Sequence, residues 1–194
     1  MDDTIRVFIA LDLPEEEKQA LADAIRHLRV AIPYGVRWVD PAGIHLTLKF
    51  LGNINASLTE DILKAMQRAT QGFQGGKFDL RLSGLGLFPS ERQPRVLWAG
   101  LAGDLDSLKS LQEKVDEEIC RLGFVREKRP FNPHLTLGRV RDGVSASVRR
   151  QVSDVFAATR LESGSPWKVD RVHLIRSTLT PNGAKYTSLS STLL

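Results

Sequence analysis

The chain has 194 residues, and 42% of them are hydrophobic, which is enough to bury the core of one generous domain or of two small lobes. It has no apolar run long enough to span a membrane and no basic, apolar leader, and Cys120 is its only cysteine; we therefore expect no membrane helix, no secretory signal and no internal disulfide, and a cytoplasmic location. The net charge of +4 at pH 7 mildly favours polyanionic partners such as nucleic acid.

The first part of the chain predicts two strand–helix units. Alternating hydrophobic residues predict a strand over residues 4–11, and Pro14 followed by three glutamates predicts the first turn of a helix. Residues 44–51 predict a second strand. Residues 57–60 form a capping-box pattern, which predicts that a helix begins there with Ser57 as its N-cap. The second unit therefore repeats the first in outline.

The rest of the chain predicts more strands than helices. Residues 78–82 and 96–101 indicate a hairpin, whose long loop holds Arg92 and Arg95. Hydrophobic residues at helical spacing predict a helix over 104–122 that ends near Gly123. Further expected elements are a strand at 134–140, a short helix around Val152, and strands at 169–175 and 185–189.

These elements indicate a mixed α+β fold. Several connections have the length of hairpins or short loops, which favours antiparallel sheets over a doubly wound parallel sheet. No low-complexity segment or long linker divides the chain. We therefore expect residues 1–194 to form a single domain.

One short segment occurs twice. His45-Leu46-Thr47-Leu48 reappears as His134-Leu135-Thr136-Leu137. A strand turns alternate side chains to opposite faces, so each His is expected on the same face as its Thr. Leu46, Leu48 and Phe50 are expected on the opposite face of the first copy. The two strands would then bury their leucines and present His and Thr to a polar surface.

Paired histidines suit chemistry at a phosphodiester. An in-line displacement needs a base on the attacking oxygen and an acid on the leaving oxygen, and imidazole serves both roles near neutral pH. Hydroxyls such as those of Thr47 and Thr136 can donate hydrogen bonds to the non-bridging phosphate oxygens. No third or fourth ligand type is repeated at a matching offset, so we expect neither a metal nor another cofactor.

These motifs resemble the two-histidine (2H) phosphoesterase superfamily, which is defined by two His-x-Thr/Ser-x motifs about half a chain apart. The similarity covers essentially the whole chain and is closest to the branch of RNA 2′,3′-cyclic phosphodiesterases, formerly named 2′-5′ RNA ligases. It rests on four segments: RVFIAL at 6–11, VRWV at 36–39, HLTLKFLG at 45–52 and RPFNPHLTLGR at 129–139.

The resemblance implies a bilobal fold of two antiparallel sheets, with helices outside and a central cleft that carries both motifs. It implies hydrolysis of RNA 2′,3′-cyclic phosphate ends, such as those of tRNA fragments, to 2′-phosphates without a metal or nucleotide cofactor. By position, His45 matches the proton donor and His134 the proton acceptor. Thr47 and Thr136 match the hydroxyls that hold the phosphate. We expect the enzyme to be a monomer.

Arg139 matches a position that is often basic after the second motif of related enzymes. It lies five residues after His134, so a regular strand turns it to the opposite face from that histidine. A β-bulge at Gly138 would bring it back. With such a bulge, Arg139 is a candidate phosphate ligand.

Other residues allow simpler interpretations. His27 and His173 are expected to be structural or solvated. The aromatic residues that can stack on a nucleobase are more typical of a core, and the arginines that can attract RNA are also typical of an ordinary surface. The aromatic residues are Phe8, Trp38, Phe88 and Trp98, and the arginines are Arg37, Arg92, Arg95 and Arg129.

Alternative functions use the same fold. The two histidines would also serve a 2′-5′ phosphodiesterase, or the reverse reaction, which is 2′-5′ RNA ligation. A protein that only binds RNA is a different class of function. Binding alone does not need two titrating imidazoles, so the complete pair of motifs favours an enzyme.

Overall fold

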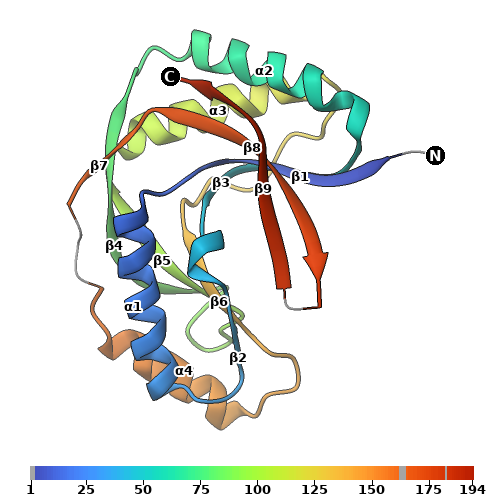
Figure 1. Ribbon diagram of the computed structural model, residues 1–194. Helices are drawn as coiled ribbons and strands as arrows, with labels where there is room; N and C mark the ends of the chain where they lie inside the picture. Colours follow the sequence, from blue (N-terminus) through green and yellow to red (C-terminus); the bar gives the residue numbers. More distant parts are fainter. Residues whose placement is uncertain (1–2, 162–164, 182) are drawn as a thin grey trace.

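Two antiparallel sheets organise the computed structural model, which describes residues 3–161, 165–181 and 183–194 (Figure 1). The four-stranded sheet has the order β3-β1-β8-β9, with bounds β1 Thr4–Leu11, β3 Leu46–Asn55, β8 Arg171–Thr180 and β9 Gly183–Leu193. The five-stranded sheet has the order β2-β6-β5-β4-β7, with bounds β2 Val36–Trp38, β4 Phe78–Phe88, β5 Val96–Gly103, β6 Leu135–Val140 and β7 Trp167–Val169. All neighbouring strands run antiparallel. The expected α+β class with two antiparallel sheets is therefore confirmed.

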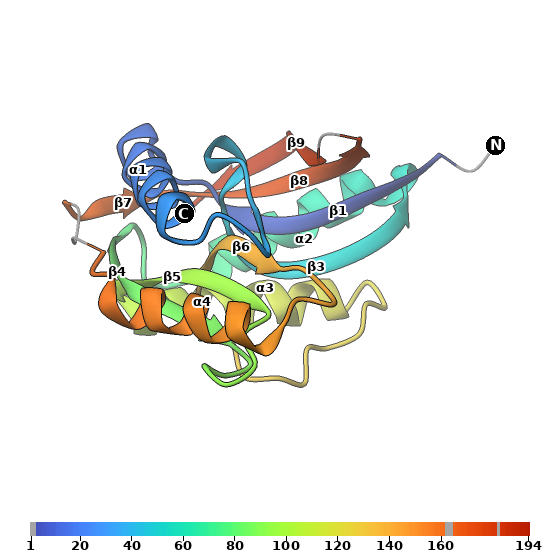
Figure 2. The same cartoon turned by 90° about the horizontal axis from the view of Figure 1, so that it is seen from below.

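The helices lie outside the sheets in two pairs (Figures 1 and 2). Helices α2 (Thr59–Gly72) and α3 (Leu105–Cys120) pack side by side, and α3 also contacts β3. Helices α1 (Glu15–Ala31) and α4 (Ala146–Ala158) meet at the other end, where the Gln151 side chain donates to the Ala31 carbonyl at 3.0 Å. Short 3-10 turns, η1 (Pro41–Gly43) and η2 (Ala56–Leu58), precede β3 and α2. No helix in the described ranges is long and apolar enough to cross a bilayer.

Both sheets share one hydrophobic core. The buried leucines of the two repeated segments belong to it together: Leu46 and Leu48 from β3, Leu135 and Leu137 from β6. These four leucines are buried, as strand alternation predicts, and they attach the two motifs to the same packed interior.

Two local predictions differ from the structure. The predicted strand 169–175 is divided at Asp170, because the chain passes there from β7 in the five-stranded sheet to β8 in the four-stranded sheet. The prediction of a capping box at Ser57 is also wrong. The Asn55 side chain instead accepts from the Ser57 backbone N–H at 3.0 Å and caps η2, and α2 begins at Thr59 without a side-chain cap.

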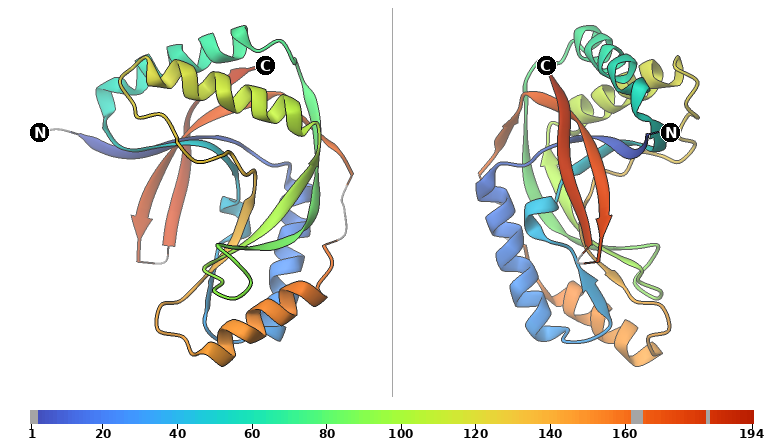
Figure 3. Two further views of the ribbon diagram at one scale, coloured as in Figure 1. Left: turned by 180° about the vertical axis from the view of Figure 1, so that it is seen from behind. Right: turned by 45° about the vertical axis from the view of Figure 1, so that its right-hand side comes forward.

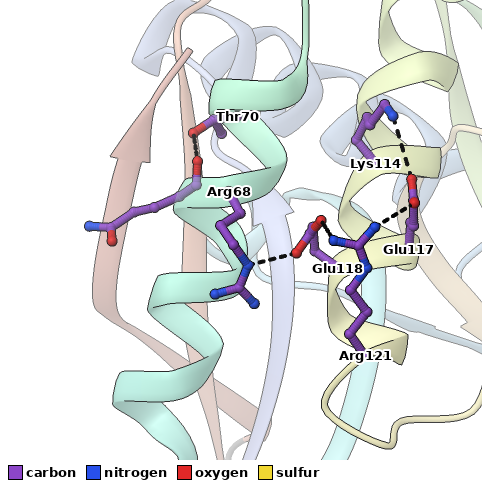
Figure 4. A network of polar contacts seen from close by, with 7 residues as sticks. Arg68, Thr70, Lys114, Glu117, Glu118 and Arg121 are labelled. Carbon is purple, nitrogen blue, oxygen red and sulfur yellow. Dashed lines mark hydrogen bonds and ion pairs between the residues drawn. The ribbon is translucent and has the colours of Figure 1, made fainter.

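Ion pairs connect the outer surfaces of α2 and α3 (Figure 4). Glu118 accepts from Arg68 at 2.7 Å and from Arg121 at 2.6 Å. Glu117 accepts from Arg121 at 2.8 Å and from Lys114 at 3.4 Å. The basic side chains of this helical layer therefore have carboxylate partners.

Candidate active site

His45 lies between η1 and β3 in an aromatic environment. Its Nδ1 atom is 2.8 Å from the Gly43 carbonyl oxygen, which can only accept a hydrogen bond. The imidazole stacks on the Phe8 ring, with centroids 4.3 Å apart and planes 27° apart. The Tyr186 ring meets the imidazole edge-on at 4.9 Å. The ring of His45 is therefore held on three sides, and no residue in the described ranges bonds to its Nε2 atom, which is free to meet a ligand.

Gly43 makes this packing possible. A Cβ atom at this position would lie 2.9 Å from Cδ2 of Tyr186, closer than real Cβ contacts. Without a side chain at position 43, the Tyr186 ring rests on the backbone whose carbonyl orients His45. A glycine is needed here because of the close approach of this ring.

His134 precedes β6 in a matching arrangement. Its Nδ1 atom is 2.8 Å from the Asn132 carbonyl oxygen, two residues upstream, as in the first copy. Phe88 of β4 meets the imidazole edge-on at 5.1 Å, and Trp98 of β5 lies 5.0 Å from Phe88. In both histidines the neutral ring then carries its proton on Nδ1. Each Nε2 atom is consequently a lone-pair site that can accept a proton and later return it.

The two threonines lie beside these histidines on half-buried positions of β3 and β6. Thr47 is the partner of Ala10 on β1, and Thr136 is the partner of Trp98 on β5. Within the described part of the chain, neither hydroxyl has a hydrogen-bond partner. Both hydroxyls are therefore available to donate to a bound anion.

A β-bulge follows the first motif and overturns one prediction. Ala10 pairs with Thr47, whereas the preceding Ile9 pairs with Lys49, so Leu48 is an extra residue in β3. The bulge reverses the faces of Lys49 and Phe50, and a second register shift follows at Leu51. Phe50 was expected in the core with Leu48, but its side chain is 69% exposed and its ring lies 5.9 Å from that of Phe8.

Polar groups of α3 hold this bulge. The Lys49 ammonium pairs with the Asp116 carboxylate in the interior, and it also donates to the Val125 carbonyl at 3.0 Å. The Gln112 side chain donates to the carbonyl of the bulged Leu48 at 3.4 Å. Removing one member of such a buried pair typically costs ~3–5 kcal/mol, because a buried charge is left uncompensated. The strand that carries Thr47 is thus anchored to α3.

A second bulge follows the second motif. Trp98 of β5 pairs with Thr136, whereas Leu97 pairs with Gly138, so Leu137 is the extra residue. Leu137 and Val140 are both buried although they are three residues apart. Arg139 between them therefore lies on the face of Thr136, and not on the opposite face that a regular strand would give it.

A pocket of about 150 Å³ adjoins His45. Its lining includes Tyr186, Ser188 and His173, with Nδ1 of His173 lying 3.3 Å from the Ser188 hydroxyl. The Lys18–Asp12 ion pair, at 2.9 Å, forms another part of the wall. Nothing in the duplicated segment marks these neighbours, because they come from other parts of the chain and none repeats. A third histidine beside His45 is visible only in the fold.

Burial lowers the pKa of His45 from its ordinary value of about 6.5, since the aromatic surroundings penalise the charged imidazolium. The Gly43 hydrogen bond and the charge of Asp12 oppose this shift without cancelling it. The pKa of His173 is lowered for the same main reason, its burial. The free protein therefore holds His45 mainly neutral at neutral pH.

We expect an NMR titration of the histidine rings to show this shift directly. The His45 midpoint should lie below 6.5 and should rise when inorganic phosphate binds, because an anion favours the imidazolium. The unfolded chain takes up this proton near pH 6.5 and the folded chain does so only at lower pH, so the free energy of unfolding should fall as the pH is lowered through 6.5. A His45 midpoint at or above 6.5 in the free protein would contradict the burial argument.

The two motifs begin in the middle of the molecule, where the sheets meet (Figures 1 and 3). Trp38 of β2 pairs with Gly138 of β6, and the next residue, Val39, donates its N–H to the Leu137 carbonyl at 3.0 Å. From there the chain needs only a few residues and η1 to reach His45. The first motif is therefore tied by a short segment to the strand of the second.

Comparisons with known proteins agree with this architecture. The family model described as LigT-like phosphoesterase matches residues 11–98 and 102–186. An RNA 2′,3′-cyclic phosphodiesterase of Thermotoga maritima is 33% identical over 183 residues, which cover 94% of this chain and 91% of the relative. A crystal structure from Thermus thermophilus superposes with a TM-score of 0.75 at 31% identity and 98% coverage of both chains. The structure of Escherichia coli LigT complexed with 3′-AMP has a TM-score of 0.73 at 25% identity and 99% coverage of both chains.

Proposed function

Because this chain belongs to the LigT-like phosphoesterase family, we propose that it hydrolyses RNA 2′,3′-cyclic phosphate ends to 2′-phosphates, with His45 and His134 as its acid and base. One observation carries the proposal. Each histidine is oriented by a carbonyl two residues upstream, which leaves Nε2 of each ring available for proton transfer. Two such imidazoles supply both proton transfers of an in-line displacement.

The proposed reaction is a single displacement at phosphorus. His134 accepts a proton from a water molecule, whose oxygen bonds to phosphorus as the bond to the ribose O3′ breaks. His45 donates a proton to O3′, so the products are a 2′-phosphate and a 3′-hydroxyl, and one water has been consumed. The donor and acceptor roles are assigned from the family resemblance.

The remaining candidates act on the phosphate itself. The hydroxyls of Thr47 and Thr136 donate hydrogen bonds to the two non-bridging oxygens, where negative charge sits throughout the reaction. Arg139 adds a positive charge on the same sheet face as Thr136. The exposed position of Arg139 and the bulge that turns it there support this role.

The lowered pKa of His45 bears on its role as the acid. The free enzyme holds this ring largely neutral at neutral pH, but a bound cyclic phosphate brings a negative charge next to Nε2. That charge favours the imidazolium, so substrate binding raises the pKa of the donor where protonation is needed. The proton is then available in the complex that reacts.

Turnover of a short oligonucleotide with a 2′,3′-cyclic phosphate end, measured in excess EDTA after dialysis, tests this function. We expect full activity and a 2′-phosphate product, because side chains fill both proton-transfer roles. In the described part of the chain, no three His, Cys, Asp or Glu residues are grouped as a metal site requires. Loss of activity that one divalent ion restores would contradict the metal-free mechanism.

This assay, run beside a matched oligonucleotide with an internal 2′-5′ linkage, separates the alternatives. A protein that only binds RNA would bind the oligonucleotide without product, and a 2′-5′ phosphodiesterase would cleave an internal 2′-5′ linkage in preference to the cyclic end. In ligation a 5′-hydroxyl replaces water as the group that bonds to phosphorus while the bond to O3′ breaks, so weak ligation would be compatible with hydrolysis. That tRNA fragments supply the cyclic ends and that the enzyme is monomeric remain predictions, to be checked by end sequencing and sedimentation.

A further inference from the structure

Three arginines lie on the site face of the five-stranded sheet, which is the face that carries Thr136. Arg139 reaches this face through the bulge at Leu137, and its direct partner on β2 is Arg37. Residues that are directly opposite on antiparallel strands share a face. Arg141 follows two residues after Arg139, and its N–H donates to the Gly35 carbonyl at 2.8 Å, which continues the pairing of β2 and β6. Alternation turns Arg141 to the same face.

These arginines have no compensating charge among the residues that the structure describes. None of the three side chains forms an ion pair or a hydrogen bond with any residue of the described ranges, and all three residues are exposed. The carboxylates nearest in sequence, Asp40 and Asp142, do not pair with them. Like charges directly opposite on two strands destabilise a sheet, so the pairing of Arg37 with Arg139 costs stability in the free protein. The basic residues of α2 and α3 in Figure 4 have carboxylate partners instead.

We propose that Arg37, Arg139 and Arg141 form a track for the backbone of single-stranded RNA on the 5′ side of the cyclic end. The inference rests on the proposed function, which places the cyclic phosphate beside Thr136. Only the 5′ side of a terminal nucleotide continues into RNA, and its next charged groups are phosphodiesters. Guanidinium groups bind phosphate oxygens through two parallel N–H donors, and RNA would relieve the repulsion within the track.

The consequence is a preference for oligonucleotides over cyclic mononucleotides. A mononucleotide such as 2′,3′-cyclic AMP places its cyclic phosphate at the phosphate-binding residues but has no second phosphodiester for Arg37 and Arg141. An oligonucleotide has both the cyclic phosphate and the phosphodiesters on its 5′ side. The track therefore determines how strongly the enzyme prefers RNA ends, and it acts through binding of the strand and not through the proton transfers.

The test compares kcat/KM for 2′,3′-cyclic AMP and for a tetranucleotide with the same cyclic end. In Arg37→Gln and in Arg141→Gln, the ratio of tetranucleotide to mononucleotide kcat/KM should fall about 5- to 10-fold at low salt, since each variant loses a phosphate contact. Arg26→Gln on α1 is the matched control, because Arg26 is exposed and is paired with Asp23. This control should keep the wild-type ratio.

A binding experiment tests the track without turnover. Fluorescence anisotropy measures the affinity for a tetranucleotide with a 3′-hydroxyl end at several salt concentrations. Each lost phosphate contact should make the slope of log affinity against log salt shallower by about 0.7. Unchanged slopes in Arg37→Gln and Arg141→Gln, or equal losses on both substrates, would overturn the track. Wild-type protein that binds the strand with the expected slopes but turns over neither substrate would instead refute the proposed function alone.

Discussion

His45→Ala and His134→Ala are each expected to lower the rate of hydrolysis by ~10²- to 10⁴-fold, the usual contribution of a general acid or base. The two groups act on opposite ends of one displacement, so the double variant should be little slower than either single variant. Single-turnover assays on the cyclic-phosphate oligonucleotide measure the rates, and anisotropy should show retained RNA binding. His27→Ala is the matched control, because His27 is an exposed histidine of α1. Activity within a few-fold of wild type in either site variant would remove that histidine from the mechanism.

A better leaving group distinguishes the two histidines. An activated phosphodiester, whose leaving alcohol departs without protonation, needs the base but not the acid. It should rescue His45→Ala far more than His134→Ala if His45 is the donor. Rescue of His134→Ala alone would exchange the two roles. If neither variant is rescued while the product remains a 2′-phosphate, the acid–base scheme itself is wrong.

Thr47→Val and Thr136→Val are expected to slow turnover by ~10²- to 10³-fold each, the typical effect of removing one donor to a developing oxyanion. Valine nearly preserves the shape of threonine and suits a strand, so the variants should fold. The loss should appear mainly in kcat, because the non-bridging oxygens, already negative in the substrate, gain further negative charge as the water oxygen bonds to phosphorus, and the hydrogen bonds strengthen there.

Thr4→Val serves as the control for the threonine variants. Thr4 is an exposed residue at the far end of β1, in the sheet that contains Thr47. The Thr4→Val variant should retain wild-type kinetics. Near-normal kcat in both Thr47→Val and Thr136→Val would show that the hydroxyls do not hold the phosphate.

The local sequence pattern alone predicted the candidate site residues and the buried face of each motif. The repeated His-Leu-Thr-Leu segment made both histidines and both threonines the candidate site residues, because a strand alternates its side chains whatever sheet it joins. That local rule also placed Leu46, Leu48, Leu135 and Leu137 in the interior, and hairpin-length connections indicated the antiparallel sheets. These properties depend on neighbours in sequence, which are visible without the fold.

Only the tertiary structure decided what surrounds the two motifs. Whether Phe50 and Arg139 face the site depends on bulges after Thr47 and Thr136, and a bulge is held by partners far away in sequence, such as Gln112 and Asp116 for β3. Alternation alone places Phe50 on the wrong face, because one extra residue reverses the faces of the residues that follow it, up to the next bulge. The neighbours of His45 likewise come from strands remote in sequence, and nothing local marks Phe8, His173 or Tyr186 as adjacent. Their contacts form only when the sheets fold, since burial of the shared core, and not local preference, brings those strands together.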